Sequence, residues 1–268
     1  DEVSGRVLRI DARGRRTVLA SGPGMSELAV AGATIAYRAG DAIWSKDGAA
    51  APVRAVSVGK ARVLGLVLAG DRLYWSDTQR VQTAPRSGGA AAAVYDPPRR
   101  SLGTGAPDAQ LVIVDGTVYF STLGWGSDGI QRVVDATTSA PLYETFADDE
   151  VWVGDSLARA GDALYISNSA GQIVRAPLAG GGVRAVVTGI EGAPVELAGG
   201  GDRLVAQYVE DGAYTIAAVD PLAGKLTVLV SLPGEDAAML AVAPAGDAVY
   251  AGLRGSDLIV RIPLPPVR

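Results

Sequence analysis

Five acidic residues lie shortly before apolar segments that recur along the chain, and these side chains have the clearest potential for chemistry. They are Glu27, Asp108, Asp155, Glu196 and Asp236, and a sixth segment has Arg62 in the corresponding place. Carboxylates that converge repel one another unless a cation neutralises them. The chain has no histidine and no cysteine, so oxygen ligands remain, and these suit a hard cation such as Ca²⁺. One hypothesis is a Ca²⁺ site. The alternative is that these acids cap turns, begin strands or face solvent.

A second group of residues combines aromatic rings with charge on long connections. Residues 95–110 and 145–156 exceed the usual length of a turn, and long loops in compact proteins are often functional. Rings stack on apolar faces while polar neighbours supply hydrogen bonds, which suits a peptide or sugar ligand. The alternative is a pair of insertions without a ligand. The candidate ligand-binding residues are Tyr95, Arg99, Trp125, Asp128 and Trp152.

Other chemistry is poorly supported. No histidine is present to activate a serine, and neither a G-x-S-x-G elbow nor a G-x-x-x-x-G-K-[ST] phosphate loop occurs. A net charge of −5 without a basic run disfavours nucleic acid as a partner. No apolar run approaches the roughly 18 residues of a membrane span, and without cysteine there are no disulfides.

The elements that position these residues form a repeat. Six copies of one pattern follow each other, and each has a Gly/Asp turn, a strand with an anchor residue that is aromatic in five copies, a polar connection and a second alternating strand. The spacing of about 40 to 45 residues is typical of β-propellers. The anchors are Tyr37, Tyr74, Tyr119, Tyr165, Val205 and Tyr250.

Each copy follows a short apolar strand and leads to an outer strand, so we predict four antiparallel strands per unit. The innermost strand is rich in Leu, Val, Ala and Gly, as expected for a strand that is covered on both faces. The prediction is one all-β domain over residues 1–268, a six-bladed β-propeller. The blades begin near residues 25, 63, 109, 155, 195 and 238.

Closing the ring avoids exposed sheet edges. Residues 5–21 resemble the last two strands of a unit, so we expect them to pair with the C-terminal blade. Residues 6–10 and 257–264 both have the pattern of its third strand and compete for one place. We favour residues 15–21 as the closing outer strand and leave residues 6–10 open.

The copy from Asp71 resembles the YWTD repeat of six-bladed propellers, with Tyr74, Trp75, Ser76 and Asp77 in the motif. The copy from Asp162 matches the second half of that repeat, and the last copy also looks like NHL, gluconolactonase-type and TolB-like propellers. This resemblance implies the fold and transfers no activity. In the YWTD motif the polar residues mostly join blades, so it implies a structural role for Asp77. Gluconolactonase-like propellers use a Glu, an Asn and an Asp on Ca²⁺; Glu27 could match the Glu, but Asn168 is the only asparagine.

The leading hypothesis is a non-enzymatic, extracytoplasmic bacterial propeller that binds a protein, peptide or glycan partner through its loops. The alternative is a Ca²⁺-dependent hydrolase or lyase that uses the acidic residues, and a third is a structural scaffold. We expect a monomer that does not insert into a membrane. We also expect a secreted, periplasmic or cell-surface location, with the leader or anchor absent from this sequence.

Overall fold

The computed structural model describes eleven segments, and all its regular elements are strands. The described residues are 6–10, 15–22, 24–77, 80–97, 107–122, 128–145, 153–191, 196–233, 237–242, 247–253 and 259–265. The prediction of an all-β protein is confirmed. Within this described part, we find no helix with the length and apolarity needed to cross a membrane.

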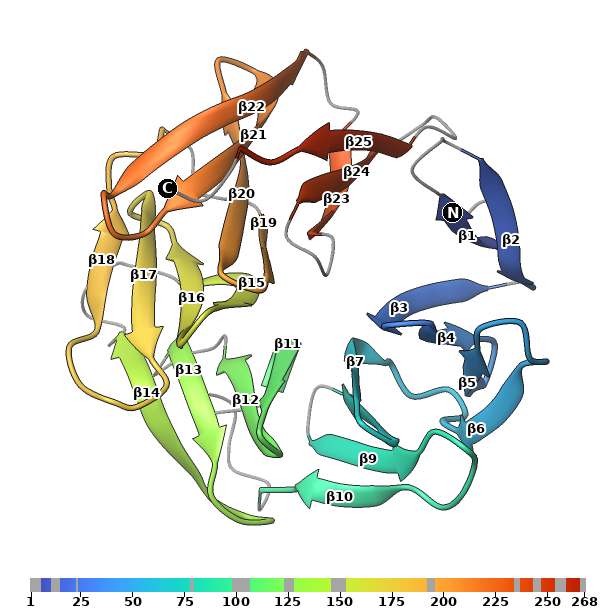
Figure 1. Cartoon of the computed structure of the whole chain (residues 1–268). Coiled ribbons are helices and arrows are strands. Elements are labelled where there is room, and N and C mark those ends of the chain that lie inside the picture. The colour runs from blue at the N-terminus through green and yellow to red at the C-terminus, as the bar shows by residue number, and fades with distance from the viewer. Residues whose placement is uncertain are drawn as a thin grey trace. The chain divides into compact units, whose positions relative to one another are not determined.

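Antiparallel sheets follow one another along the chain (Figure 1), and neighbouring strands in each sheet are neighbours in sequence. Five sheets have the predicted four strands, and the sixth has three described strands. A further pair, β1 and β2, precedes them. The order within a sheet is that of a propeller blade.

The strands of the first three sheets and of the N-terminal pair have the following bounds. They are β1 Arg6–Ile10, β2 Arg16–Ser21; β3 Met25–Ala31, β4 Thr34–Ala39, β5 Ala42–Asp47, β6 Val53–Ser57; β7 Leu64–Ala69, β8 Arg72–Ser76, β9 Val81–Pro85, β10 Ala92–Tyr95; β11 Pro107–Val114, β12 Thr117–Thr122, β13 Asp128–Val133 and β14 Ser139–Thr145.

The remaining three sheets begin with β15. Their strands are β15 Val153–Ala160, β16 Ala163–Asn168, β17 Gln172–Pro177, β18 Arg184–Val187; β19 Glu196–Gly200, β20 Arg203–Glu210, β21 Ala213–Asp220, β22 Lys225–Pro233; β23 Ala237–Val242, β24 Ala248–Leu253 and β25 Ile259–Pro263.

The chain forms two compact units, and each is described by itself. Unit 1 comprises Asp1–Pro98, Ile113–Val118 and Val133–Thr138. Unit 2 comprises Arg99–Val112, Tyr119–Arg132 and Ser139–Arg268. The sheet β11–β14 contributes residues to both units.

In unit 1, the sheets β3–β6 and β7–β10 share a hydrophobic core. Trp75, Leu73 and Ile43 are among its most deeply buried side chains, and Ala36 faces the same core. Side chains alternate along a strand, so the neighbours of Ala36 point to the other face of β4. There Ile35 and Tyr37 form a second cluster with Val7 of β1, Ala20 of β2 and Met25 of β3. The pair β1–β2 therefore covers the face of the first sheet that points away from β7–β10.

Tyr37 lies one residue later in its strand than the other predicted anchors do in theirs. Tyr74 and Tyr165 stand two residues after the first residue of their strands, whereas Tyr37 stands three residues after Thr34. The anchor position in β4 is held by Ala36. A one-residue difference moves a side chain to the opposite face of a strand, which explains why Tyr37 packs toward β1–β2.

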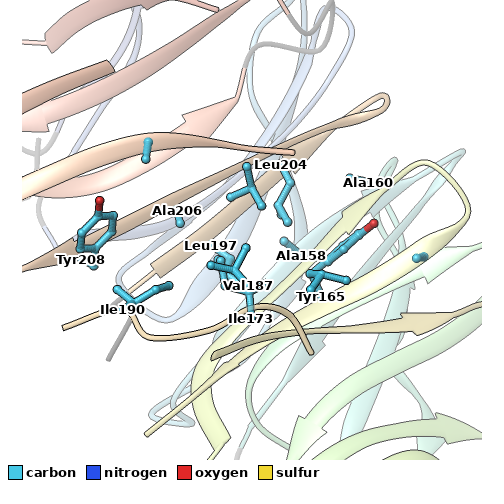
Figure 2. Packing of buried hydrophobic residues seen from close by; sticks show 14 residues of the cluster. Ala158, Ala160, Tyr165, Ile173, Val187, Ile190, Leu197, Leu204, Ala206 and Tyr208 are labelled. Atoms are coloured by element: carbon cyan, nitrogen blue, oxygen red, sulfur yellow. The ribbon is translucent and has the colours of Figure 1, made fainter. Parts of the chain in front are cut away.

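In unit 2, the sheets β15–β18 and β19–β22 share a cluster of buried apolar side chains (Figure 2). Tyr165, Ile173, Leu197 and Leu204 belong to it. The innermost strands approach closely, because a Cβ atom added at Gly199 of β19 would lie 2.0 Å from the carbonyl O of Arg159 on β15. The expectation that glycine on innermost strands reflects crowding is met at Gly199.

The third place in the C-terminal sheet is filled by β25, which pairs with β24 along Ala248–Gly252. The competing segment, β1, pairs with β2. Closure of the ring by residues 5–21 stays a prediction, as does a single domain over residues 1–268.

Candidate functional site

We define the loop end of a sheet as the end at which its innermost strand begins and its second strand ends. The register places these together, since Val153 pairs with Asn168 and Glu196 pairs with Gln207. Connections that leave one sheet and enter the next arrive here, and they vary in length. They comprise residues 58–63, 96–106, 146–152, 188–195 and 234–236.

At the opposite end, the first hairpins of five sheets are uniform. The turn between the first and second strands has two residues in five sheets, at 32–33, 70–71, 115–116, 161–162 and 201–202. Such tight hairpins leave little variable surface. Binding residues concentrate on variable loops carried by a rigid scaffold, so the loop end is the candidate site.

Three of the predicted ligand-binding residues stand on or beside these connections, and Trp125 and Asp128 stand on or beside the connection between β12 and β13. Tyr95 is the last residue of β10 and only 4% exposed, so its ring packs inside the protein. Asp128 is the first residue of β13. Arg99, Trp125 and Trp152 lie outside the described residues. Ligand binding by this group stays a prediction.

Of the five predicted metal ligands, the structure describes the side chains of Glu27 and Glu196. Asp108 lies in β11 and Asp155 in β15, whose backbones are described there, and Asp236 lies outside the described residues. Among the described residues, no cluster of three or more carboxylates is placed to hold a metal ion. A Ca²⁺ site formed by the five acids stays a prediction.

Glu27 lies in a β-bulge between Ser26 and Leu28, with φ of 49°. This left-handed conformation is costly for a residue with a side chain. Gly65 holds the same position in the next innermost strand, also beside a register shift, with φ of 55°. Glu27 therefore occupies a place for which glycine is the better residue.

Glu196 directly precedes Leu197, and in two other innermost strands the residue at this position joins neighbouring sheets. Gln110 precedes Leu111, and its Oε1 accepts the Leu157 N–H at 2.9 Å. Ser156 precedes Leu157, and its Oγ bonds the backbone of Leu197. This position therefore serves contact between sheets, a role that the sequence reasoning missed. Its signal was a polar residue directly before the strand leucine in all three copies.

Two turns at the loop end are held by side chains that the sequence had singled out. Asn168 is 1% exposed, and its Oδ1 accepts the N–H groups of Ala170 and Gln172 at 3.1 Å each. Asp77 accepts bonds from the Arg80 N–H at 3.1 Å, from Arg80 Nε at 2.9 Å and from Gln82 Nε2 at 2.7 Å. These bonds hold Asp77 in its own turn, and the role between blades that the resemblance implied stays a prediction. The amide oxygen of Asn168 is likewise occupied by its own turn.

Comparisons with known proteins identify the fold. No family model and no curated protein matches the sequence. A chain from the crystal structure of a nidogen/laminin complex is 14% identical with a TM-score of 0.61, and the match covers 86% of this chain and 90% of that one. The WD40 repeats of RRP9 are 13% identical with a TM-score of 0.64, over 98% of this chain and 89% of that one.

A third match is the extracellular domain of a proposed one-component system from B. thetaiotaomicron. It is 11% identical with a TM-score of 0.61, and the match covers 92% of this chain but 37% of that chain. WD40 repeats build β-propellers from four-stranded sheets, the sheet type found here. At these identities the likeness shows the fold alone, and it confirms that this chain is a β-propeller.

Proposed function

We propose that this chain is a non-enzymatic, extracytoplasmic bacterial propeller that binds a protein, peptide or glycan partner at its loop end. The observation that carries the proposal is the contrast between the two ends of the sheets. Five sheets share a two-residue first hairpin, while the connections at the loop end differ in length. The shortest comprises residues 234–236 and the longest residues 96–106. Variable loops on a constant scaffold are the usual arrangement of a binding surface.

The composition of these connections supports a binding role. The connection 146–152 ends with Trp152, and the connection between β12 and β13 contains Trp125. Tryptophan is enriched at the centres of interfaces, because a large rigid ring buries much area at low entropic cost. Two proteins of similar fold also support the proposal. One comes from a complex of two proteins, and the other is an extracellular domain.

The residues described at the loop end give less support to the hydrolase alternative. A gluconolactonase-like site needs an asparagine on the ion, and the amide of Asn168, the only one in the chain, is buried and bonded within its turn. Glu27 lies on a bulge in unit 1, and Glu196 holds a position that joins sheets in unit 2. We therefore propose binding without catalysis.

Photo-crosslinking tests the proposal. A photoreactive phenylalanine analogue would replace Trp125 or Trp152, and each variant would be irradiated in an envelope extract of the source organism and on an oligosaccharide array. We expect one defined adduct from both positions. Matched controls carry the same group at Leu222, which is 86% exposed on the β21–β22 turn, and at Ala33 in a first hairpin.

Adducts that form equally well from Leu222 and Ala33 would contradict a site at the loop end. Trp125→Ala and Trp152→Ala should each weaken binding of the identified partner by about tenfold or more, the usual effect of removing an interfacial tryptophan. Unchanged binding by both variants would exclude these two loops.

A further inference from the structure

The loop end of the sheet β7–β10 carries exposed basic side chains on two described chain segments. Lys60 and Arg62 stand in the connection that enters β7, and Arg80 directly precedes β9. The register places the start of β7 beside the end of β8, since Leu64 pairs with Ser76, and the end of β10 beside the start of β9, since Tyr95 pairs with Val81. Arg99 and Arg100 follow in the next connection, outside the described residues. We call Lys60, Arg62 and Arg80 the basic patch.

The backbone that carries Lys60 and Arg62 is anchored. The carbonyl O of Asp41 accepts the N–H groups of Val58 at 2.8 Å and Gly59 at 3.0 Å. Ala61 N–H closes a turn on Val58 O at 3.1 Å, and Val63 is 2% exposed in the core of unit 1. The two basic side chains are therefore presented from a preorganised segment, which lowers the entropy lost on binding.

Arg80 is oriented by Asp77. Its Nε lies 2.9 Å from Asp77 Oδ2; the Asp77 side chain is 7% exposed and the Arg80 side chain 45%. The hydrogen bond to Asp77 raises the pKa of Arg80, the charge of Asp77 adds to this, and the charge of Asp96 contributes further. A guanidinium bonded through Nε keeps its two terminal nitrogens as donors, and these can bind a carboxylate in a fork geometry.

Two of the acidic residues near the basic patch already have bonded partners, and a third is exposed. Asp77 bonds Arg80 and Gln82, and Asp41 pairs with Arg54 at 2.9 Å. Asp96 is exposed beside the end of β10, where it offsets part of the positive charge. The whole chain has a net charge of −5, so the basic patch stands against the overall balance.

We propose that the basic patch of Lys60, Arg62 and Arg80 binds an acidic segment of a protein partner. The inference rests on the proposed binding function and adds the chemistry of the partner. Arginine forks match carboxylates, and the net negative charge of the chain repels a long polyanion more than a short acidic segment that touches the patch alone. Both reasons favour an acidic peptide over a polyanionic glycan.

Fluorescence anisotropy with a labelled oligoglutamate peptide tests the inference. We expect binding that weakens by about tenfold or more when ionic strength rises from about 0.05 M to about 0.5 M, because exposed charges are screened. The double variant Lys60→Glu/Arg62→Glu should lose about tenfold or more in affinity. The matched control, Arg132→Glu/Lys225→Glu, makes the same change of charge at exposed positions on β13 and β22 and should bind as the parent does.

Equal losses in both double variants would overturn the inference, since net charge alone would explain the effect. Binding of heparin without binding of oligoglutamate would also overturn it in favour of a polyanionic glycan. If neither probe binds while crosslinks still form at Trp125 or Trp152, the proposed binding by the basic patch is wrong and the proposed function is retained. If no crosslink forms but oligoglutamate binds through the patch, the proposed role of those two loops fails instead.

Discussion

The hydroxyl of Ser156 bonds both backbone groups of Leu197, with Oγ 2.6 Å from the N and 3.1 Å from the carbonyl O. Ser156 lies on β15 and Leu197 on β19, so one side chain ties the innermost strands of two successive sheets. Both residues are buried, at 1% and 3% exposure. These two bonds are protected from water, so their loss leaves polar groups without partners.

Replacing Ser156 with Ala should therefore lower the free energy of unfolding by about 1–3 kcal/mol, the usual cost of orphaning buried polar groups. Urea unfolding followed by far-UV circular dichroism measures this. The matched control is Ser87→Ala, since Ser87 is exposed in the turn after β9. Equal stability of the Ser156 variant and its control would show that the contact contributes nothing.

Replacing Gly199 with Ala should be more damaging. The new Cβ would lie 2.0 Å from Arg159 O, and backbone atoms cannot yield as the end of a side chain can. We expect a loss of about 3 kcal/mol or failure to fold, the upper range for overpacking. Gly182→Ala is the control, because its Cβ would meet nothing within 4 Å. A folded, fully stable Gly199 variant would contradict the close approach of β15 and β19.

Stability should not depend on calcium. Glu27 and Glu196 are the predicted ligands with described side chains; Glu27 lies on a bulge in β3, and Glu196 is the first residue of β19. We expect the melting temperature to change by less than about 1 °C between exhaustive EDTA treatment and added Ca²⁺, because an ion bound to the folded state would raise it. A reversible rise of several degrees would restore the metal site and the hydrolase hypothesis.

Two variants make that measurement specific. Glu27→Gly relieves the left-handed backbone and should raise stability, while Glu27→Gln should leave any metal response unchanged. Loss of a Ca²⁺-induced rise in melting temperature in Glu27→Gln would identify Glu27 as a ligand.

Asp135 should contribute a pH-dependent part of the stability. The hydrogen bond from the Thr138 side chain, followed by bonds from the N–H and hydroxyl of Thr137, lowers its pKa from 3.8 to about 2. A carboxyl whose pKa is lowered on folding stabilises the protein above its unfolded value, and this is lost as pH falls through the folded value. The contribution is thus complete above about pH 4 and fades toward about pH 2.

Asp135→Asn should therefore lower the melting temperature slightly at pH 7 and flatten its decline between about pH 4 and pH 2. Thermal melts across that range measure the effect. Asp211→Asn is the control, as Asp211 is another exposed turn aspartate. A pH profile of the Asp135 variant that runs parallel to the parent's would show that the turn bonds do not matter for stability.

The sequence alone predicted the all-β class, the repeat and the four-stranded unit. These features are local: alternating apolar residues make a strand, and a Gly-Asp pair such as 161–162 makes a tight hairpin between two strands. The bonds of Asp77 are local too, because they reach residues within the next few positions of the chain.

Tertiary structure decided what depends on pairing between distant segments. Residues 6–10 and 259–263 have the same strand pattern, and only their partners distinguish them, β2 for the first and β24 for the second. The face of Tyr37 depended on one residue of register, which an alignment of aromatic residues does not reveal. The bond between Ser156 and Leu197 joins residues 41 positions apart. A pattern in sequence specifies an element and its faces, but packing selects which neighbour each face meets.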